Sequence, residues 1–116
     1  MTRFIVAAAF LFLIAGAVRA QAQHPCAADA SAKAWPLLQH HFLGSEGEKI
    51  HNNYSVGVAV KTLPPIRALK GSGRFDVLEI WGYIYKAEYR MRFIYAQIKG
   101  SCVLMGQEII EASNPY

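Results

Sequence analysis

The stretch that decides the fold is residues 74–110, RFDVLEIWGYIYKAEYRMRFIYAQIKGSCVLMGQEII. Apolar and aromatic side chains recur in it with a period of two, and two short polar segments, 86–88 and 99–101, interrupt the pattern. We therefore predict three consecutive β-strands over 74–85, 88–98 and 102–110, joined by hairpin turns. Connections this short leave no room for crossover helices, so the strands must be antiparallel.

A further strand is expected upstream of this stretch. Over residues 54–60, tyrosine and valine alternate with small or polar residues, and Pro64 and Pro65 follow. Because proline cannot donate a hydrogen bond to a strand ladder, we expect this first strand to end before the two prolines. The polar residues 45–53 before it are typical of a connecting loop.

Residues 26–42 have the pattern of a helix. They are rich in alanine, Asp29 is a candidate N-cap, and Trp35, Leu38 and Phe42 recur at helical spacing. Pro36 predicts a kinked helix, or two short pieces that meet near Trp35. A kinked N-terminal helix packed on a single curved four-stranded antiparallel meander places the chain in the α+β class.

This order of elements resembles the cystatin fold and a reduced ketosteroid-isomerase-like roll. The resemblance extends over most of residues 23–116 and implies a fold only. Neither an inhibitor motif nor a catalytic dyad of these families can be located in the chain, so the resemblance transfers no functional residue.

The first 22 residues have the pattern of an export signal. Arg3 precedes an apolar run from Phe4 to Val18, and Ala20-Gln21-Ala22 fits the small-x-small pattern of a signal peptidase site. Cleavage there leaves one small domain, residues 23–116. No stable membrane anchor is expected, because a spanning helix needs roughly 20 apolar residues. We therefore expect a periplasmic or secreted protein.

Cys26 and Cys102 are the two cysteines of the chain. An even count in an exported protein predicts a disulfide, which would restrict the unfolded chain by about 4 to 5 kcal/mol. A catalytic, free or intermolecular thiol stays open as an alternative, although no sequence neighbour obviously lowers a thiol pKa. His24-Pro25 does not resemble the small apolar residues before a lipoprotein cysteine, which disfavours a lipid anchor.

Charge weighs against nucleic acid as a partner. The chain has 12 Lys and Arg residues against 8 Asp and Glu, and removal of Arg3 and Arg19 with the signal leaves a net charge of about +2. The remaining basic residues are not clustered as a phosphate-binding face requires.

Three-residue turns would set the register of the sheet. They place Trp81 opposite Phe93, and Arg92 opposite Glu108 as an ion pair. One face of the sheet is then aliphatic, with Leu78, Ile80, Ile94, Ala96, Ile98 and Leu104. The other face is aromatic, with Trp81, Tyr83, Tyr85, Tyr89, Phe93 and Tyr95.

A single helix can cover only one of these faces. The disulfide would draw the helix to the aliphatic face, which carries Cys102, and leave the aromatic face as a binding surface. Two alternatives stay open: the helix covers the aromatic side chains, or the sheet curves over them and closes a pocket. A slip of one residue in register would invert every side chain.

No catalytic motif is present. The chain has no GxSxG, HExxH or CxxC sequence, no phosphate loop and no dinucleotide-binding glycine fingerprint. We therefore predict no catalytic residue, no metal site and no cofactor. His40 and His41, with His51, or His24 beside the new N-terminus, could hold a metal ion only with further ligands.

Arg90 and Arg92 share one face of a strand and are a possible contact for an anion. Pairing with Glu88 and Glu108 explains both arginines equally well. An anion contact at these arginines is therefore a secondary prediction.

Together these features favour a small exported non-enzymatic binding module. Its aromatic sheet face, with Trp81, Tyr83 and Phe93 as anchors, would hold a protein partner or a second copy in a homodimer. The alternative is a pocket protein or enzyme that binds a small apolar ligand in the concave face of the sheet, with Glu79 acting from the wall. A structural envelope protein in a tight assembly is the third possibility.

Overall fold

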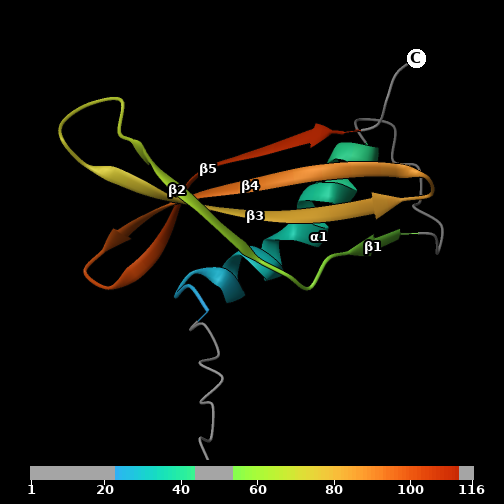
Figure 1. The fold of residues 1–116 in the computed structure, drawn as a ribbon, viewed down its shortest axis with the longest axis horizontal. Helices are drawn as coiled ribbons and strands as arrows, with labels where there is room; N and C mark the ends of the chain where they lie inside the picture. Colours follow the sequence, from blue (N-terminus) through green and yellow to red (C-terminus); the bar gives the residue numbers. More distant parts are fainter. Residues whose placement is uncertain (1–22, 44–53, 113–116) are drawn as a thin grey trace, which may run out of the picture.

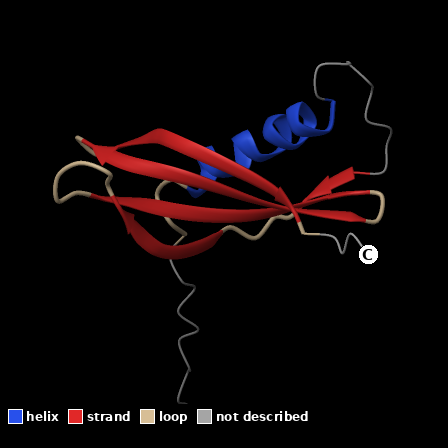
Figure 2. Cartoon of the chain, turned by 90° about the horizontal axis from the view of Figure 1, so that it is seen from above, coloured by secondary structure: helices blue, strands red, loops and turns tan. Residues whose placement is uncertain are grey.

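The computed structural model describes residues 23–43 and 54–112. The elements in chain order are α1 (Ala27–Leu43), β1 (Tyr54–Val56), β2 (Lys61–Arg67), β3 (Arg74–Ile84), β4 (Ala87–Ile98) and β5 (Ser101–Glu111). The strands form one antiparallel, strongly twisted sheet, and α1 lies across one of its faces (Figures 1 and 2). The predicted α+β class is therefore confirmed. The predicted signal at 1–22 and the predicted loop at 45–53 lie outside the described residues.

The strand order is β1-β3-β4-β5, and β2 also pairs with β3. Both β1 and β2 lie along the same edge of β3, β1 at its end and β2 at its beginning. The predicted single first strand is thus wrong, because a break separates β1 from β2 and β2 continues through Pro64 and Pro65. The prolines are tolerated because β2 is an edge strand whose register shifts between Leu63 and Ile66, where they lie.

Both hairpin turns have two residues instead of the predicted three. Tyr85 and Lys86 connect β3 to β4, and Lys99 and Gly100 connect β4 to β5. Lys99 and Gly100 both have positive φ angles, 52° and 78°, as a type I′ turn requires. Tyr85 also has a positive φ of 53°, in a left-handed conformation that glycine adopts more readily.

The shorter first turn changes which residues face each other across β3 and β4. Trp81 lies opposite Arg90 instead of Phe93, and Phe93 lies opposite Leu78. This is a shift of three residues, and an odd shift exchanges the two faces of β4 relative to β3. The predicted all-aromatic face is therefore not formed.

Arg92 lies opposite Glu108 across β4 and β5, as predicted. The predicted ion pair between them is wrong, because Arg92 pairs with Glu79 and Glu108 pairs with Arg90. The turn is one residue shorter than predicted, but β5 carries one extra residue, Met105, where the register shifts between Ile94 and Tyr95. This β-bulge restores the predicted register over the rest of β5.

The core lies between α1 and the face of the sheet that α1 covers, called here the helix face. Every fourth residue from Cys26, just before the helix, to Leu38 is fully buried, and two of these four are alanines, which let the helix approach the sheet closely. The buried sheet residues below are Leu78, Ile80, Ile84, Tyr89, Met91, Phe93 and Tyr95. Gly82 lies directly under the helix, since a Cβ there would be 2.9 Å from a Leu38 methyl group.

Two details of the helix differ from expectation. The helix begins at Ala27, whose N–H donates to the His24 carbonyl oxygen at 2.9 Å, so Asp29 lies inside the first turn and is not the N-cap. Pro36 is exposed and α1 continues through it as one element, so the alternative of two short pieces is wrong. Trp35 and Phe42 are half-buried beside the core.

The predicted disulfide between Cys26 and Cys102 is confirmed. It joins the residue before α1 to the beginning of β5, with 5.6 Å between the two Cα atoms. His24 adds polar contacts at the same end: its Nδ1 accepts a hydrogen bond from the Cys26 N–H at 3.0 Å, and its Nε2 lies 3.2 Å from an Asp76 carboxylate oxygen. The beginning of the helix is thus fixed to β5 covalently and to β3 by polar contacts.

Candidate binding surfaces

The face of the sheet opposite α1 is called here the open face. Its centre is a tryptophan held by an ion pair. The Trp81 indole N–H donates to Glu79 Oε1 at 3.1 Å, and Arg92 Nε donates to Glu79 Oε2 at 2.9 Å. Lys61 lies opposite Glu79 on β2 and adds positive charge. Both carboxylate oxygens of Glu79 are therefore used to hold neighbouring side chains.

The charge state of Glu79 follows from these contacts. Burial acts to raise the pKa of this carboxyl, but the hydrogen bonds from Arg92 and Trp81, together with the charge of Arg92, outweigh it and hold the pKa below its usual range. Glu79 is thus an ionised, fully engaged group. Such a carboxylate is a poor general acid, which weighs against the catalytic role considered for it.

A second ion pair lies beside the first. Arg90 donates from Nη2 to Glu108 Oε1 at 3.1 Å, and the buried Arg90 Nε has no acceptor among the described residues. Both arginines expected to contact an anion are thus paired with carboxylates of the protein itself. An external anion would have to displace these carboxylates.

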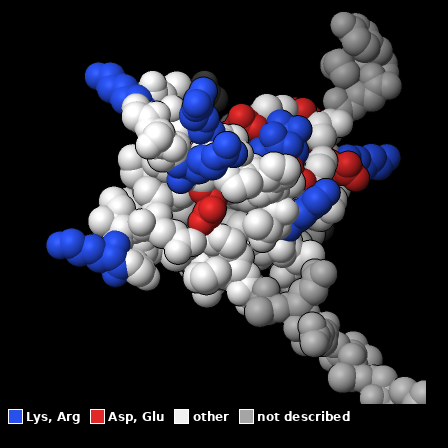
Figure 3. All heavy atoms as spheres, turned by 60° about the vertical axis from the view of Figure 1, so that its left-hand side comes forward, with Lys and Arg blue, Asp and Glu red and all other residues white. Residues whose placement is uncertain are grey.

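Exposed apolar side chains surround the two ion pairs. Tyr83 on β3 and Val103 and Ile110 on β5 each expose more than a third of their surface, and all three point to the open face. On the side of the molecule seen in Figure 3, basic and acidic side chains are interspersed over uncharged surface. Tryptophan, tyrosine and arginine, which the open face presents, are enriched at protein interfaces.

The six aromatic residues predicted to share one surface are distributed over three places. Trp81 and Tyr83 lie together on the open face, and Tyr85 is exposed in the turn after β3. The other three are buried under α1: Tyr89, Phe93 and Tyr95. The alternative in which the helix covers aromatic side chains is thus correct for β4.

Tyr95 makes a polar contact inside the core. Its hydroxyl donates to Asp29 Oδ2 at 2.6 Å, and Lys33 Nζ lies 2.7 Å from the other carboxylate oxygen. The hydrogen bond from Lys33 and then the one from Tyr95 hold the pKa of Asp29 below its usual value, whereas burial and Asp29 raise the pKa of Tyr95. The cluster joins α1 to β4 and is a structural contact.

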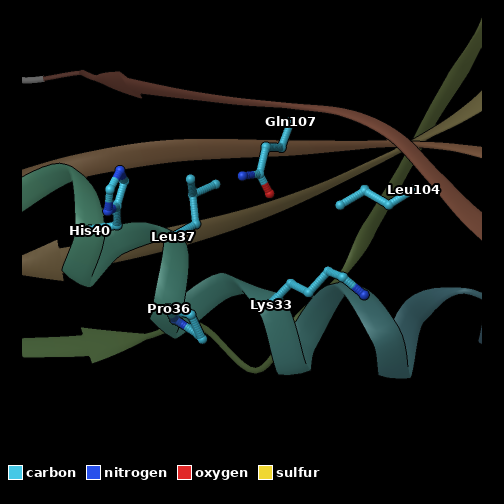
Figure 4. A pocket seen from close by; sticks show the side chains of 6 residues that line it. All are labelled: Lys33, Pro36, Leu37, His40, Leu104 and Gln107. Atoms are coloured by element: carbon cyan, nitrogen blue, oxygen red, sulfur yellow. The ribbon is translucent and has the colours of Figure 1, made fainter.

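A groove of about 360 Å³ lies between α1 and β5, and the sequence did not predict it. It is lined by Lys33, Pro36, Leu37 and His40 of α1 and by Leu104 and Gln107 of β5 (Figure 4). The side chains of β3 and β4 under α1 are buried, whereas those on the helix side of β5 are half-buried or exposed, so α1 leaves this side of β5 partly uncovered. The position of the groove depends on how the helix sits on the sheet, for which the sequence carries no separate pattern.

β5 forms one edge of the sheet in the part of the chain that the structure describes. The backbone groups on its outer side therefore have no neighbouring strand among those residues. Their availability makes the edge a third candidate surface, beside the open face and the groove.

Within residues 23–43 and 54–112, no group of three or more His, Cys, Asp and Glu side chains could hold a metal ion. His40 lines the groove, and the His41 ring meets the Tyr89 ring edge-on with 5.6 Å between the ring centroids. His51 lies outside the described residues. The described helix is too short and too polar to cross a membrane.

No family model matches the chain, and no curated protein sequence and no solved structure is similar to it. The resemblance to cystatins and to ketosteroid-isomerase-like rolls thus remains an expectation from the order of the elements.

Proposed function

We propose that this protein is a non-enzymatic binding module that holds a protein partner with the open face of its sheet. The observation that carries the proposal is the fixed Trp81 indole, which hydrogen-bonds a carboxylate that Arg92 also holds, on a face that α1 does not cover. Tryptophan, tyrosine and arginine supply most of the binding energy at protein interfaces, especially where they are held in place before binding.

The composition of the open face supports a protein partner over a small ligand. Its exposed apolar side chains are spread over β3 and β5, with charged groups between them, and none of the described residues on this face lines the groove. The Cys26–Cys102 disulfide is compatible with the proposed location outside the cytoplasm.

The test replaces Tyr83 with a photo-crosslinking phenylalanine analogue and compares it with the same change at Tyr85, which lies in the turn. A partner crosslinked only from position 83 would then be purified and titrated. We expect Trp81→Ala to weaken its binding at least tenfold, which is about 1.4 kcal/mol, without loss of the folded state. Tyr85→Ala serves as the matched aromatic control. Equal labelling from both positions, or equal affinity of both alanine variants, would contradict the proposal.

The groove supports a second candidate function, binding of a small apolar ligand. Pro36, Leu37 and Leu104 provide its apolar lining. Leu37→Lys should then abolish binding of an environment-sensitive apolar dye, and Trp81→Ala should leave it unchanged. Loss of dye binding in Trp81→Ala but not in Leu37→Lys would instead indicate that the dye binds the open face.

A further inference from the structure

We propose that two copies of this protein pair through their β5 strands, antiparallel about a twofold axis, so that one sheet continues through both molecules. The inference concerns the edge of β5, which shares with the open face the apolar side chains of Val103 and Ile110, and goes beyond the proposed function. Partner binding can fail while this pairing holds, and the reverse is also possible.

The two edges of the sheet differ in how they are protected against pairing. β2, on one edge, contains Lys61, Pro64, Pro65 and Arg67, the residue types that block addition of another strand. β5, on the other edge, has the sequence SCVLMGQEIIE, with no lysine, arginine or proline. β5 carries two glutamates and the bulge at Met105, but without proline or lysine it is the less protected of the two edges against a further strand.

The bulge at Met105 limits the possible registers. It inverts the alternation along β5, so that Val103, Gly106, Glu108 and Ile110 point to the open face. Cys102, Leu104, Gln107, Ile109 and Glu111 point to the helix face. Directly opposite residues of an antiparallel pair point to the same face of the sheet. With Met105 left out of the ladder, neighbouring residues of β5 point to opposite faces. The twofold axis must therefore lie between one residue and the same residue of the second copy.

Among the central registers, one pairs apolar residues on both faces. An axis at Gln107 sets Leu104 opposite Ile109 on the helix face and Val103 opposite Ile110 on the open face. Val103 and Ile110, which are 37% and 45% exposed, would both become covered. This match makes β5 complementary to itself, as a twofold interface requires.

The neighbouring registers are worse. An axis at Glu108 places two glutamate carboxylates opposite each other, which is destabilising. An axis at Gly106 sets Val103 against Glu108 and Leu104 against Gln107, which pairs apolar with polar side chains.

With the axis at Gln107, Glu111 of each molecule lies opposite Cys102 of the other, on the helix face. The pairing would also join the two open faces into one continuous surface.

The first experiment is site-specific crosslinking of the purified protein. In Gln107→Cys the two introduced thiols lie opposite each other, at a Cα separation of about 4.5–5.5 Å that suits a disulfide. In Glu108→Cys they are displaced along the strands to roughly 8 Å, which is too far. Thiol pairing under mild oxidation should therefore be at least tenfold faster for Gln107→Cys. Thr62→Cys, on the β2 edge, controls for chance collisions, and intact mass verifies the Cys26–Cys102 bond.

The second experiment avoids new cysteines. The unaltered protein should be a dimer by light scattering at tens of micromolar, and the double variant Val103→Lys with Ile110→Lys should be a folded monomer. Equal crosslinking of Gln107→Cys and Glu108→Cys, faster crosslinking of Glu108→Cys, or an unaltered protein that stays monomeric would each overturn the proposal. Trp81→Ala should leave both readouts unchanged, which separates this proposal from the proposed function.

Discussion

The helix face and the open face are built from the same strands, and they differ in how their side chains are held in place. On the helix face, large side chains such as Phe93 and Met91 are fully buried against a helix stripe of small residues. On the open face, Trp81 and the arginines are fixed by hydrogen bonds and ion pairs while remaining partly exposed. Stability should therefore depend mainly on the first face, and recognition on the second.

The largest effect should come from a cavity on the helix face. Phe93→Ala removes a fully buried ring and is expected to cost about 3–5 kcal/mol in the free energy of unfolding. Tyr83→Ala, on the open face, should change it by about 0.5 kcal/mol or less. Urea unfolding followed by circular dichroism measures both. Similar losses from the two variants would mean that the open face is also part of the core.

A smaller effect is expected from adding one methyl group to a glycine on each face. In Gly82→Ala the new Cβ would lie 2.9 Å from Leu38 and 3.0 Å from Met91, so the helix or these side chains must shift, at about 1 kcal/mol or more. In Gly106→Ala the nearest atom on the open face is 3.7 Å away, an ordinary contact. The matched pair should differ in melting temperature, with Gly82→Ala the lower. A lower value for Gly106→Ala would contradict the assignment of the two faces.

The smallest effect should appear only in acid. The pKa of Glu79 is lowered in the folded state, so its contribution to stability is present above pH 4.5, the ordinary glutamate value, and is lost as the pH falls through the folded pKa. Glu79→Gln should therefore be less stable than the unaltered protein at pH 7, and the difference should shrink below pH 4.5. Melting curves between pH 2.5 and pH 7 test this.

Asp29→Asn is the matched variant on the side of the helix. The pKa of Asp29 is also lowered in the folded state. The difference in stability between Asp29→Asn and the unaltered protein should therefore shrink below pH 3.8, the ordinary aspartate value. If the difference in melting temperature between Glu79→Gln and the unaltered protein were the same at every pH between 2.5 and 7, the ion pair between Glu79 and Arg92 would add no charge-dependent stability.

The sequence predicts the elements of this fold better than their pairing. The extents of β3, β4 and β5, the helix and the disulfide follow from periodicity and cysteine count, and the structure agrees within one or two residues. The length of a hairpin turn has no such pattern. Lys86 fits a two-residue turn with Tyr85 or a three-residue turn with Ala87 and Glu88, and this one choice decides which side of β4 lies under the helix.

The unknown length of the turn between β3 and β4 also explains why the six aromatic residues do not share one face. Trp81 and Tyr83 were placed together correctly because they belong to one strand, where alternation alone decides the face. Tyr89, Phe93 and Tyr95 were placed with them through the register between strands, and they are buried. The groove between α1 and β5 depends on the angle of the helix, which no residue pattern encodes.

The disulfide also gives the molecule a defined response to mechanical force. Cys26 and Cys102 are 76 residues apart, so the bond closes the helix, β1 to β4 and both the predicted loop and the hairpins into one covalent ring. Tension applied between the two ends of the chain would pass directly from Cys26 to Cys102. Only the segments outside the ring could lengthen, by peeling β5 from β4, whereas the chain inside the ring could not be extended until the bond is reduced.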